Sequence, residues 1–293
     1  MAKPRHRPGR GARRLAGPGP EDYTHTMSFW PVPLRRAPRV SVVRLSGMIG
    51  AGGRFAGGLN DAGLAPLLER AFRRGKPAAV ALTINSPGGS PVQSSLIGAR
   101  IRRLAEETEV PVHAFVEDLA ASGGYWLAAA ADDIWVDAAS VVGSIGVISA
   151  GFGFSDAIGR IGVERRVHTA GRSKSFLDPF QPEKADDIAR LKALQEPIHR
   201  AFIAHVEARR GAKLAEGADL FTGDVWVGAQ AVELGLADGV AHMVPKLKAL
   251  YGDKVRLVAY GPRRSLFARL GRAAAGGALE AAEERLLRAG YGL

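Results

Sequence analysis

The chain has 293 residues, of which 46% are hydrophobic and 24% charged, a composition typical of a globular protein. It contains no cysteine, which excludes disulfides, zinc–cysteine sites, iron–sulfur clusters and a cysteine nucleophile. Its seven histidines are scattered and form no HExxH pattern, so we expect neither a metal nor another cofactor.

The net charge of +11 is concentrated at the two ends of the chain. Residues 1–39 carry +7 and residues 260–293 carry +3, whereas the body between them carries +1. Basic tails can touch anionic lipid without specificity, but a near-neutral body does not indicate a specific nucleic-acid partner. No apolar stretch reaches the roughly 20 residues of a membrane span, and no signal peptide is evident. We therefore expect a cytoplasmic protein with peripheral contact to anionic membranes.

Composition divides the chain into three parts. Residues 1–38 are rich in Pro, Gly and Arg and predict a disordered basic tail. Residues 39–260 predict the folded domain, and residues 261–293 predict an amphipathic helical extension. Met27 begins the sequence MSFWPVPLRR shortly before the first strand and is an alternative start.

Apolar periodicity predicts strands that alternate with helices. The predicted strands are 40–45, 80–84, 112–116, 133–137, 141–149 (one strand or a pair), 164–169 and 255–259. The predicted helices are 58–74, 92–106, a buried helix ending near 131, 155–161, 183–209, 227–234 and 244–251. Pro197 predicts a kink or break in the long helix 183–209. This alternation indicates βαβ units and a mostly parallel sheet.

Two glycine-rich turns follow predicted strands. INSPGGS (84–90) contains Gly88 and Gly89, whose backbone N–H groups can approach an oxygen that develops negative charge. AASGGYW (120–126) places Ser122 at a turn between small neighbours, where a nucleophile would be exposed. Each motif also fits an ordinary role, a strand–helix turn in the first case and a helix N-cap in the second.

A serine nucleophile needs a base to activate it. His168 lies on a predicted strand, and His199 and His205 lie on the long predicted helix, so all three fit structural roles. Lys174, in the loop AGRSKSFLDPF (170–180), is the better candidate. An amine acts as a base only when it is uncharged, a state that burial and neighbouring donors favour. A solvated surface lysine is the ordinary alternative.

Taken in order, INSPGGS, ASGGYW, GSIGV and GRSKSFLDPF resemble the motifs of the S49 peptidases, the signal peptide peptidase A and SohB group. The segment 221–238 resembles the closing segment of that family, and the resemblance covers about residues 40–250. It implies an α/β fold of the Clp protease/crotonase type, a spiral of βαβ units, in a short single-domain form. It also implies a ring-like homo-oligomer that admits short or unfolded peptides, signal peptide remnants among them.

The resemblance also implies roles for individual residues. Ser122 falls on the nucleophile and Lys174 on the base of a Ser-Lys dyad. Gly88 and Gly89 match the loop that forms the oxyanion hole and substrate-binding region, and Gly123 would add an N–H donor to it. Ser144 matches a position that could hold the lysine by a hydrogen bond.

The chain departs from the family in three places. We expect it to lack the usual N-terminal membrane anchor; in addition, Arg172-Ser173 precede the lysine and Gln181 follows the Pro-Phe pair. Two other functions stay open. One is a crotonase-like acyl-CoA enzyme, in which loop N–H groups polarise a thioester and carboxylates lie over the site; the candidates are Glu117, Asp118 and Asp132. The other is an inactive scaffold of the same fold.

Overall fold

The computed structural model describes residues 37–50, 58–171, 174–261, 285–286 and 288–291. The predicted disordered tail 1–38 therefore lies almost wholly outside the described residues, as does most of the predicted extension 261–293. Within the described ranges, no helix is both long and apolar enough to cross a bilayer.

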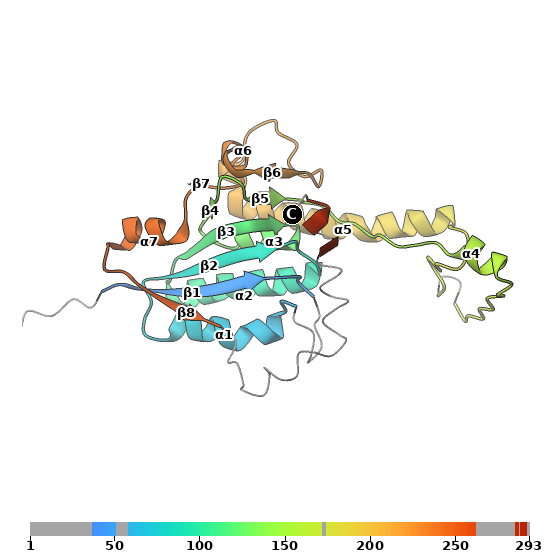
Figure 1. The fold of residues 1–293 in the computed structure, drawn as a ribbon, viewed down its shortest axis with the longest axis horizontal. Helices are drawn as coiled ribbons and strands as arrows, with labels where there is room; N and C mark the ends of the chain where they lie inside the picture. The colour runs from blue at the N-terminus through green and yellow to red at the C-terminus, as the bar shows by residue number, and fades with distance from the viewer. Residues whose placement is uncertain (1–36, 51–57, 172–173, 262–284, 287, 292–293) are drawn as a thin grey trace, which may run out of the picture. The chain divides into compact units, whose positions relative to one another are not determined.

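Eight strands form one sheet in the part of the chain that the structure describes (Figure 1). Six of them lie in the order β6-β5-β3-β2-β1-β8, while β4 pairs with β3 and β7. Only the pairing of β5 with β6 is antiparallel, which confirms the predicted α/β fold with a mostly parallel sheet. The strands are β1 (Arg39–Ser46), β2 (Ala79–Ser86), β3 (Val112–Ala121), β4 (Asp133–Val136), β5 (Val141–Gly143), β6 (Val225–Val227), β7 (Gly239–Val240) and β8 (Arg256–Tyr260).

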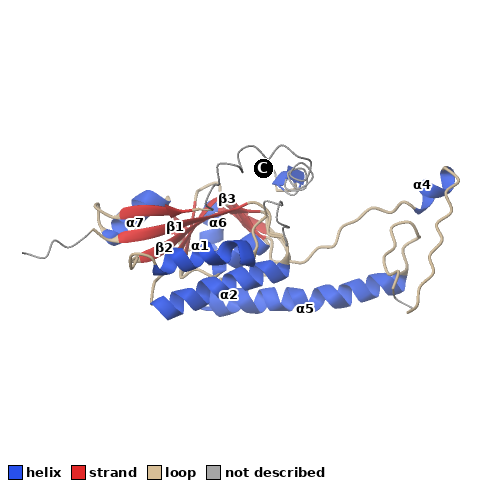
Figure 2. Cartoon of the chain, turned by 90° about the horizontal axis from the view of Figure 1, so that it is seen from below, coloured by secondary structure: helices blue, strands red, loops and turns tan. Residues whose placement is uncertain are grey.

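Helices cover both faces of this sheet, and all eight residues of β2 are buried between them. Figure 2 shows α1, α2 and α5 along one face, where Phe202 and Val206 of α5 join the main core. Leu247 of α7 packs on the other face against β1 and β2. The helices are α1 (Asp61–Arg73), α2 (Pro91–Thr108), α3 (Gly123–Ala129), α4 (Ser155–Arg160), α5 (Ala185–Arg210), α6 (Gly228–Glu233) and α7 (Met243–Tyr251).

Three predicted elements differ from the structure. The predicted strand 164–169 is wrong, because this exposed segment lies between α4 and α5 and pairs with no strand of the described sheet. The predicted strand or strand pair 141–149 is reduced to β5, and residues 144–150 are irregular. Pro197 does not break α5, which is one helix of 26 residues with the proline inside it. A proline removes one backbone hydrogen bond, and the remaining bonds hold the helix together.

An ion pair joins α1 to α2. The Arg100 guanidinium donates two hydrogen bonds of 2.6 and 2.7 Å to the Asp61 carboxylate, and this holds the pKa of Asp61 below its usual value of 3.8. We expect Asp61→Asn to lower the free energy of unfolding by about 1 kcal/mol at neutral pH.

The pH dependence of that loss follows from the direction of the shift. A carboxyl group whose pKa is lowered by folding stabilises the protein above its unfolded pKa and loses this effect as the pH falls through its folded pKa. The difference between wild type and Asp61→Asn in urea unfolding should therefore shrink as the pH falls from about 5 to below about 3. Asp186→Asn is the control, since Asp186 is an exposed first-turn residue of α5 with no ion pair among the described residues. A difference that stays constant with pH would contradict this account.

Candidate active site

Ser122 stands at a sharp turn between β3 and α3. Its backbone has φ 51° and ψ −123°, a strained conformation for a residue other than glycine. The turn is held by the Ser122 N–H, which donates to the Gly143 carbonyl at 2.8 Å, and by the Ser122 carbonyl, which accepts from Tyr125 and Trp126. The Ser122 side chain makes no capping hydrogen bond to α3, so the structure does not support a simple N-cap role.

The loop after β2 lies directly against this serine. A Cβ placed on Gly88, which has φ +97°, would lie 2.7 Å from the Gly123 nitrogen and 2.8 Å from the Ser122 Cβ. Real Cβ atoms do not approach that closely, so a side chain at position 88 would force the two turns apart. The structure thus brings the two glycine-rich motifs together, although they are more than thirty residues apart in the sequence.

At this junction, the backbone N–H groups of Gly89 and Gly123 have no hydrogen-bond partner among the described residues. The Gly88 carbonyl accepts from the Ile49 N–H at 2.7 Å, so the Gly89 N–H of the same trans peptide points away from Ile49. Gly89 and Gly123 line one small pocket together with Ser122. Free N–H groups beside a serine side chain are what an oxyanion hole for a serine nucleophile requires.

The wall of this pocket is apolar and comes partly from α5. Trp126, Ile198 and Phe202 line it, and the Trp126 and Phe202 rings stack with centroids 4.9 Å apart. The His205 ring also stacks against the Trp126 ring, with the two ring centroids 4.8 Å apart. The His205 Nε2 lies 3.0 Å from the Trp126 carbonyl oxygen. Burial lowers the pKa of His205, which favours the neutral ring. His205 therefore has the structural role that its position on the long helix indicated.

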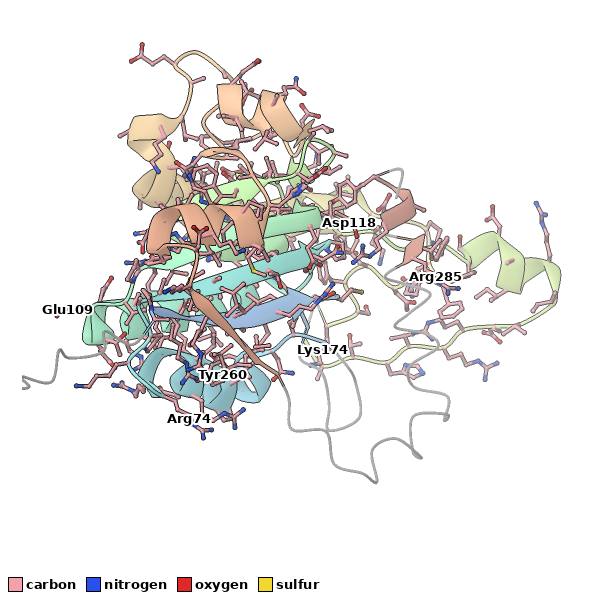
Figure 3. All side chains as sticks on the ribbon, turned by 60° about the vertical axis from the view of Figure 1, so that its left-hand side comes forward. Arg74, Glu109, Asp118, Lys174, Tyr260 and Arg285 are labelled. Atoms are coloured by element: carbon pink, nitrogen blue, oxygen red, sulfur yellow. The ribbon has the colours of Figure 1, made fainter. Side chains whose placement is uncertain are left out.

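Lys174 lies apart from this junction in the described chain. It is exposed, on the segment that joins α4 to α5 (Figure 3), and no contact between Lys174 and Ser122 occurs among the described residues. Ser144 lies closer to the turn at Ser122, because the carbonyl of the preceding residue, Gly143, accepts a hydrogen bond from the Ser122 N–H. The Ser144 Oγ accepts a hydrogen bond of 3.1 Å from the Tyr291 hydroxyl.

The three carboxylates of the acyl-CoA alternative do not converge on Ser122. Glu117 pairs with Arg44, and Asp118 accepts from the Asn85 amide at 2.6 Å. Both line a separate pocket of about 450 Å³ that does not include Ser122. Asp132 lies at the other end of β3, where its carboxylate accepts from the Val112 N–H. Within the described part of the chain, no group of His, Asp or Glu side chains is arranged to hold a metal ion.

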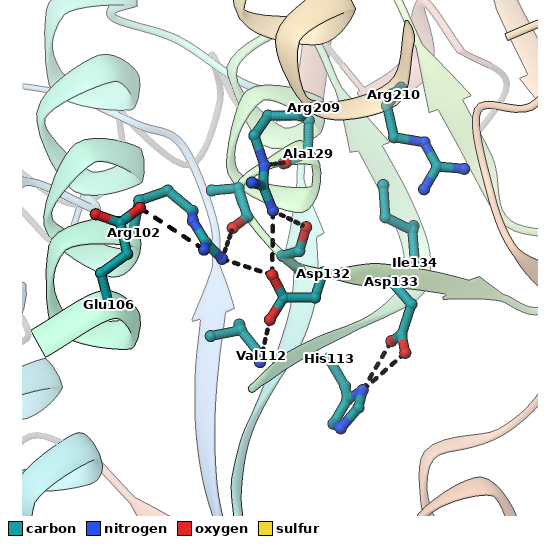
Figure 4. Close-up of polar contacts among 12 residues, drawn as sticks. Arg102, Glu106, Val112, His113, Ala129, Asp132, Asp133, Ile134, Arg209 and Arg210 are labelled. Atoms are coloured by element: carbon teal, nitrogen blue, oxygen red, sulfur yellow. Dashed lines mark hydrogen bonds and ion pairs between the residues drawn. The ribbon is translucent and has the colours of Figure 1, made fainter. Parts of the chain in front are cut away.

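The far end of α3 is fixed by two arginines (Figure 4). Arg102 of α2 donates to the Ala130 carbonyl at 3.3 Å and to the Asp132 carboxylate at 2.7 Å. Arg209 of α5 donates to the carbonyls of Ala129 and Ala131 at 3.1 and 2.8 Å. These bonds satisfy carbonyls that a helix C-terminus leaves free, and their charge is favourable there.

Comparison with protein families matches residues 105–250 to the model of peptidase family S49. A protein of Brucella melitensis named Na(+)/H(+) antiporter NhaA is 54% identical over 78% of this chain, and the match covers 31% of that protein. The chloroplastic serine protease SPPA of Arabidopsis thaliana is 30% identical over 70% of this chain, and the match covers 31% of it. The chain thus spans about a third of the length of these relatives.

Among solved structures, the chain is similar to a lysine-to-alanine variant of the membrane-bound stomatin-specific protease 1510-N in complex with a substrate peptide. That match has a TM-score of 0.45 and a sequence identity of 16%, and it covers 81% of this chain and 97% of the other.

Proposed function

The chain belongs to peptidase family S49, and we propose that it is a serine endopeptidase in which Ser122 is the nucleophile and Lys174 the base. The observation that supports this most directly is the junction at Ser122. A strained turn presents the hydroxyl, and the free N–H groups of Gly89 and Gly123 line the same pocket. The same pocket has an apolar wall, so we propose that the substrates are short or unfolded peptides with apolar side chains, including signal peptide remnants.

In the proposed reaction, the uncharged Lys174 amine takes the proton from the Ser122 Oγ while that oxygen attacks a peptide carbonyl carbon. The carbonyl oxygen becomes an oxyanion, which the Gly89 and Gly123 N–H groups stabilise. Collapse of this intermediate breaks the C–N bond, and the amine product leaves with the proton from Lys174. Water then hydrolyses the acyl ester and restores the serine.

This reaction requires Lys174 to reach Ser122, and we propose that a homo-oligomer places it there. The chain from β5 into α5, which carries Lys174, exposes large apolar side chains to solvent, as interface surfaces do. Their exposed fractions are 83% for Ile148, 81% for Phe152, 73% for Ile161, 52% for Val163 and 60% for Leu194. Contact with a second copy would bury these residues and remove the lysine from water, which favours the uncharged amine.

The proposed nucleophile can be tested by covalent labelling. A fluorophosphonate probe should label the wild-type chain, and mass spectrometry should find the adduct on Ser122. Ser122→Ala should not be labelled, because the only activated hydroxyl of the proposed site has been removed. Ser46→Ala, which changes an exposed serine at the end of β1, should be labelled at the wild-type rate. Labelling of folded Ser122→Ala at the wild-type rate would contradict the assignment.

A further inference from the structure

Ser86, the last residue of β2, is fully buried and connects two turns next to the nucleophile. Its hydroxyl donates a hydrogen bond of 2.7 Å to the Gly47 carbonyl, in the turn after β1. The same oxygen accepts a hydrogen bond of 3.2 Å from the Gly88 N–H. A serine hydroxyl has one hydrogen to donate and can also accept, so both capacities of Ser86 are used.

One of these bonds acts on the chain just before the free Gly89 N–H. The bond to Ser86 orients the peptide between Pro87 and Gly88. The next peptide is oriented by the Ile49 N–H, which donates to the Gly88 carbonyl at 2.7 Å. Ile49 lies two residues after Gly47. Ser86 therefore contacts, through the Gly47 carbonyl, the same turn whose Ile49 N–H binds the Gly88 carbonyl.

The Ser86 backbone also contacts the start of α3. A Cβ placed on Gly124 would lie 2.4 Å from the Ser86 carbonyl oxygen and 3.2 Å from the Ser86 Cβ. Ser86 therefore lies beside both turns that supply a free N–H group, the loop with Gly89 and the turn with Gly123. It lines neither pocket and touches no reacting atom itself.

We propose that Ser86 is a positioning residue, which holds the Gly89 N–H in the direction needed to stabilise the oxyanion formed at Ser122. This proposal rests on the proposed peptidase function. Without the hydroxyl, the Gly88 N–H loses its acceptor and the Gly47 carbonyl loses its donor, so both turns can reorient. An oxyanion hole depends on donors that are fixed before the reaction, so a reoriented N–H would stabilise the transition state less than it does in the wild type.

The test compares Ser86→Ala with Ser41→Ala, using a fluorogenic peptide and a peptide aldehyde. Ser41 is a matched control because it is also fully buried, in the neighbouring strand β1, and its hydroxyl has no hydrogen-bond partner in the described part of the chain. Loss of one whole oxyanion donor costs about 10²- to 10³-fold in kcat, so misdirection of one donor should cost about tenfold. We expect Ser86→Ala to lower kcat about tenfold with KM within about twofold of wild type, and Ser41→Ala to change neither.

The aldehyde separates positioning from general damage to the fold. It forms a hemiacetal with the Ser122 oxygen, so its inhibition constant should rise in Ser86→Ala by the same factor by which kcat falls. Binding of an uncleaved substrate peptide, measured in the Ser122→Ala background, should be the same with and without Ser86→Ala. If Ser86→Ala does not fold, Ser86→Cys keeps the size of the side chain with a weaker hydrogen-bonding group and should show the same pattern.

Three results would overturn the proposal. If the wild type is active and folded Ser86→Ala has the same kcat and the same aldehyde affinity, the positioning role is contradicted while the proposed function stands. Equal losses of substrate affinity and kcat/KM would assign Ser86 to ground-state structure instead. A wild-type chain that neither cleaves peptides nor reacts with the fluorophosphonate would contradict the proposed function, and this proposal with it.

Discussion

Lys174→Ala is expected to lower peptidase activity by at least about 10³-fold while the chain stays folded. In the proposed reaction this amine removes the Ser122 proton, whereas in the described chain it is exposed and contributes nothing to the core. Lys184→Ala is the matched control, because Lys184 belongs to the same segment and its amine contacts the Gln181 side chain at 3.3 Å. The measurement is kcat/KM on a fluorogenic peptide, with a thermal melt of each variant. Activity of Lys174→Ala within tenfold of wild type would rule out this lysine as the base.

A mixing experiment then shows which chain supplies the lysine. Ser122→Ala and Lys174→Ala should each be inactive alone. Because Lys174 makes no contact with Ser122 of its own chain, we expect a mixture of the two variants to recover a fraction of the wild-type activity. In such a mixture, an intact lysine of one copy meets an intact serine of another. No recovery from a mixture shown to exchange subunits would mean that the dyad forms within one chain.

The largest expected loss of stability comes from Arg210→Ala. The Arg210 side chain is buried and donates two hydrogen bonds to the Gly235 carbonyl and one of 2.6 Å to the Asp238 carboxylate. Arg210→Ala removes both side-chain donors of the Gly235 carbonyl. It also leaves the Asp238 carboxylate with a single cation, Lys213, whose amine lies 2.6 Å away. We expect the free energy of unfolding to fall by about 3 kcal/mol. Urea unfolding at neutral pH measures this loss.

Arg200→Ala provides the control on the same helix. Arg200 pairs with Glu196 one turn away, and both side chains are 61% exposed. Such a pair contributes about 0.5 kcal/mol or less. If Arg210→Ala and Arg200→Ala destabilise the protein equally, the bonds at the end of α5 do not hold α6 and β7 in place.

The fold was largely predictable because its strands are local apolar runs. β2, buried along its whole length, is the run VALTI extended at both ends, and α2 and α5 lie within two residues of their predicted bounds. The predicted strand 164–169 failed because apolar composition does not reveal whether a partner strand is in reach. β6 and β7, of three and two residues, were missed because no alternation can be recognised over so short a length.

The candidate site was predictable only where its residues lie in local motifs. Gly88, Gly89, Ser122 and Gly123 belong to turns whose sequences indicate their conformations, and the structure brings these turns together. The helical face of α5 that includes Ile198 and Phe202 could be identified, but not its contact with the pocket. That contact depends on how the sheet places α5 beside α3, which no single segment encodes.

The arginines at the end of α3 have a consequence for when the proposed site can form during synthesis. α3 has only seven residues, too few to persist as a helix in water on its own. One of its two clamps, Arg209, is translated almost ninety residues after Ser122. A growing polypeptide on the ribosome therefore exposes the serine long before its helix can be completed. If Ser122 is the proposed nucleophile, chains that end before Arg209 should have no peptidase activity.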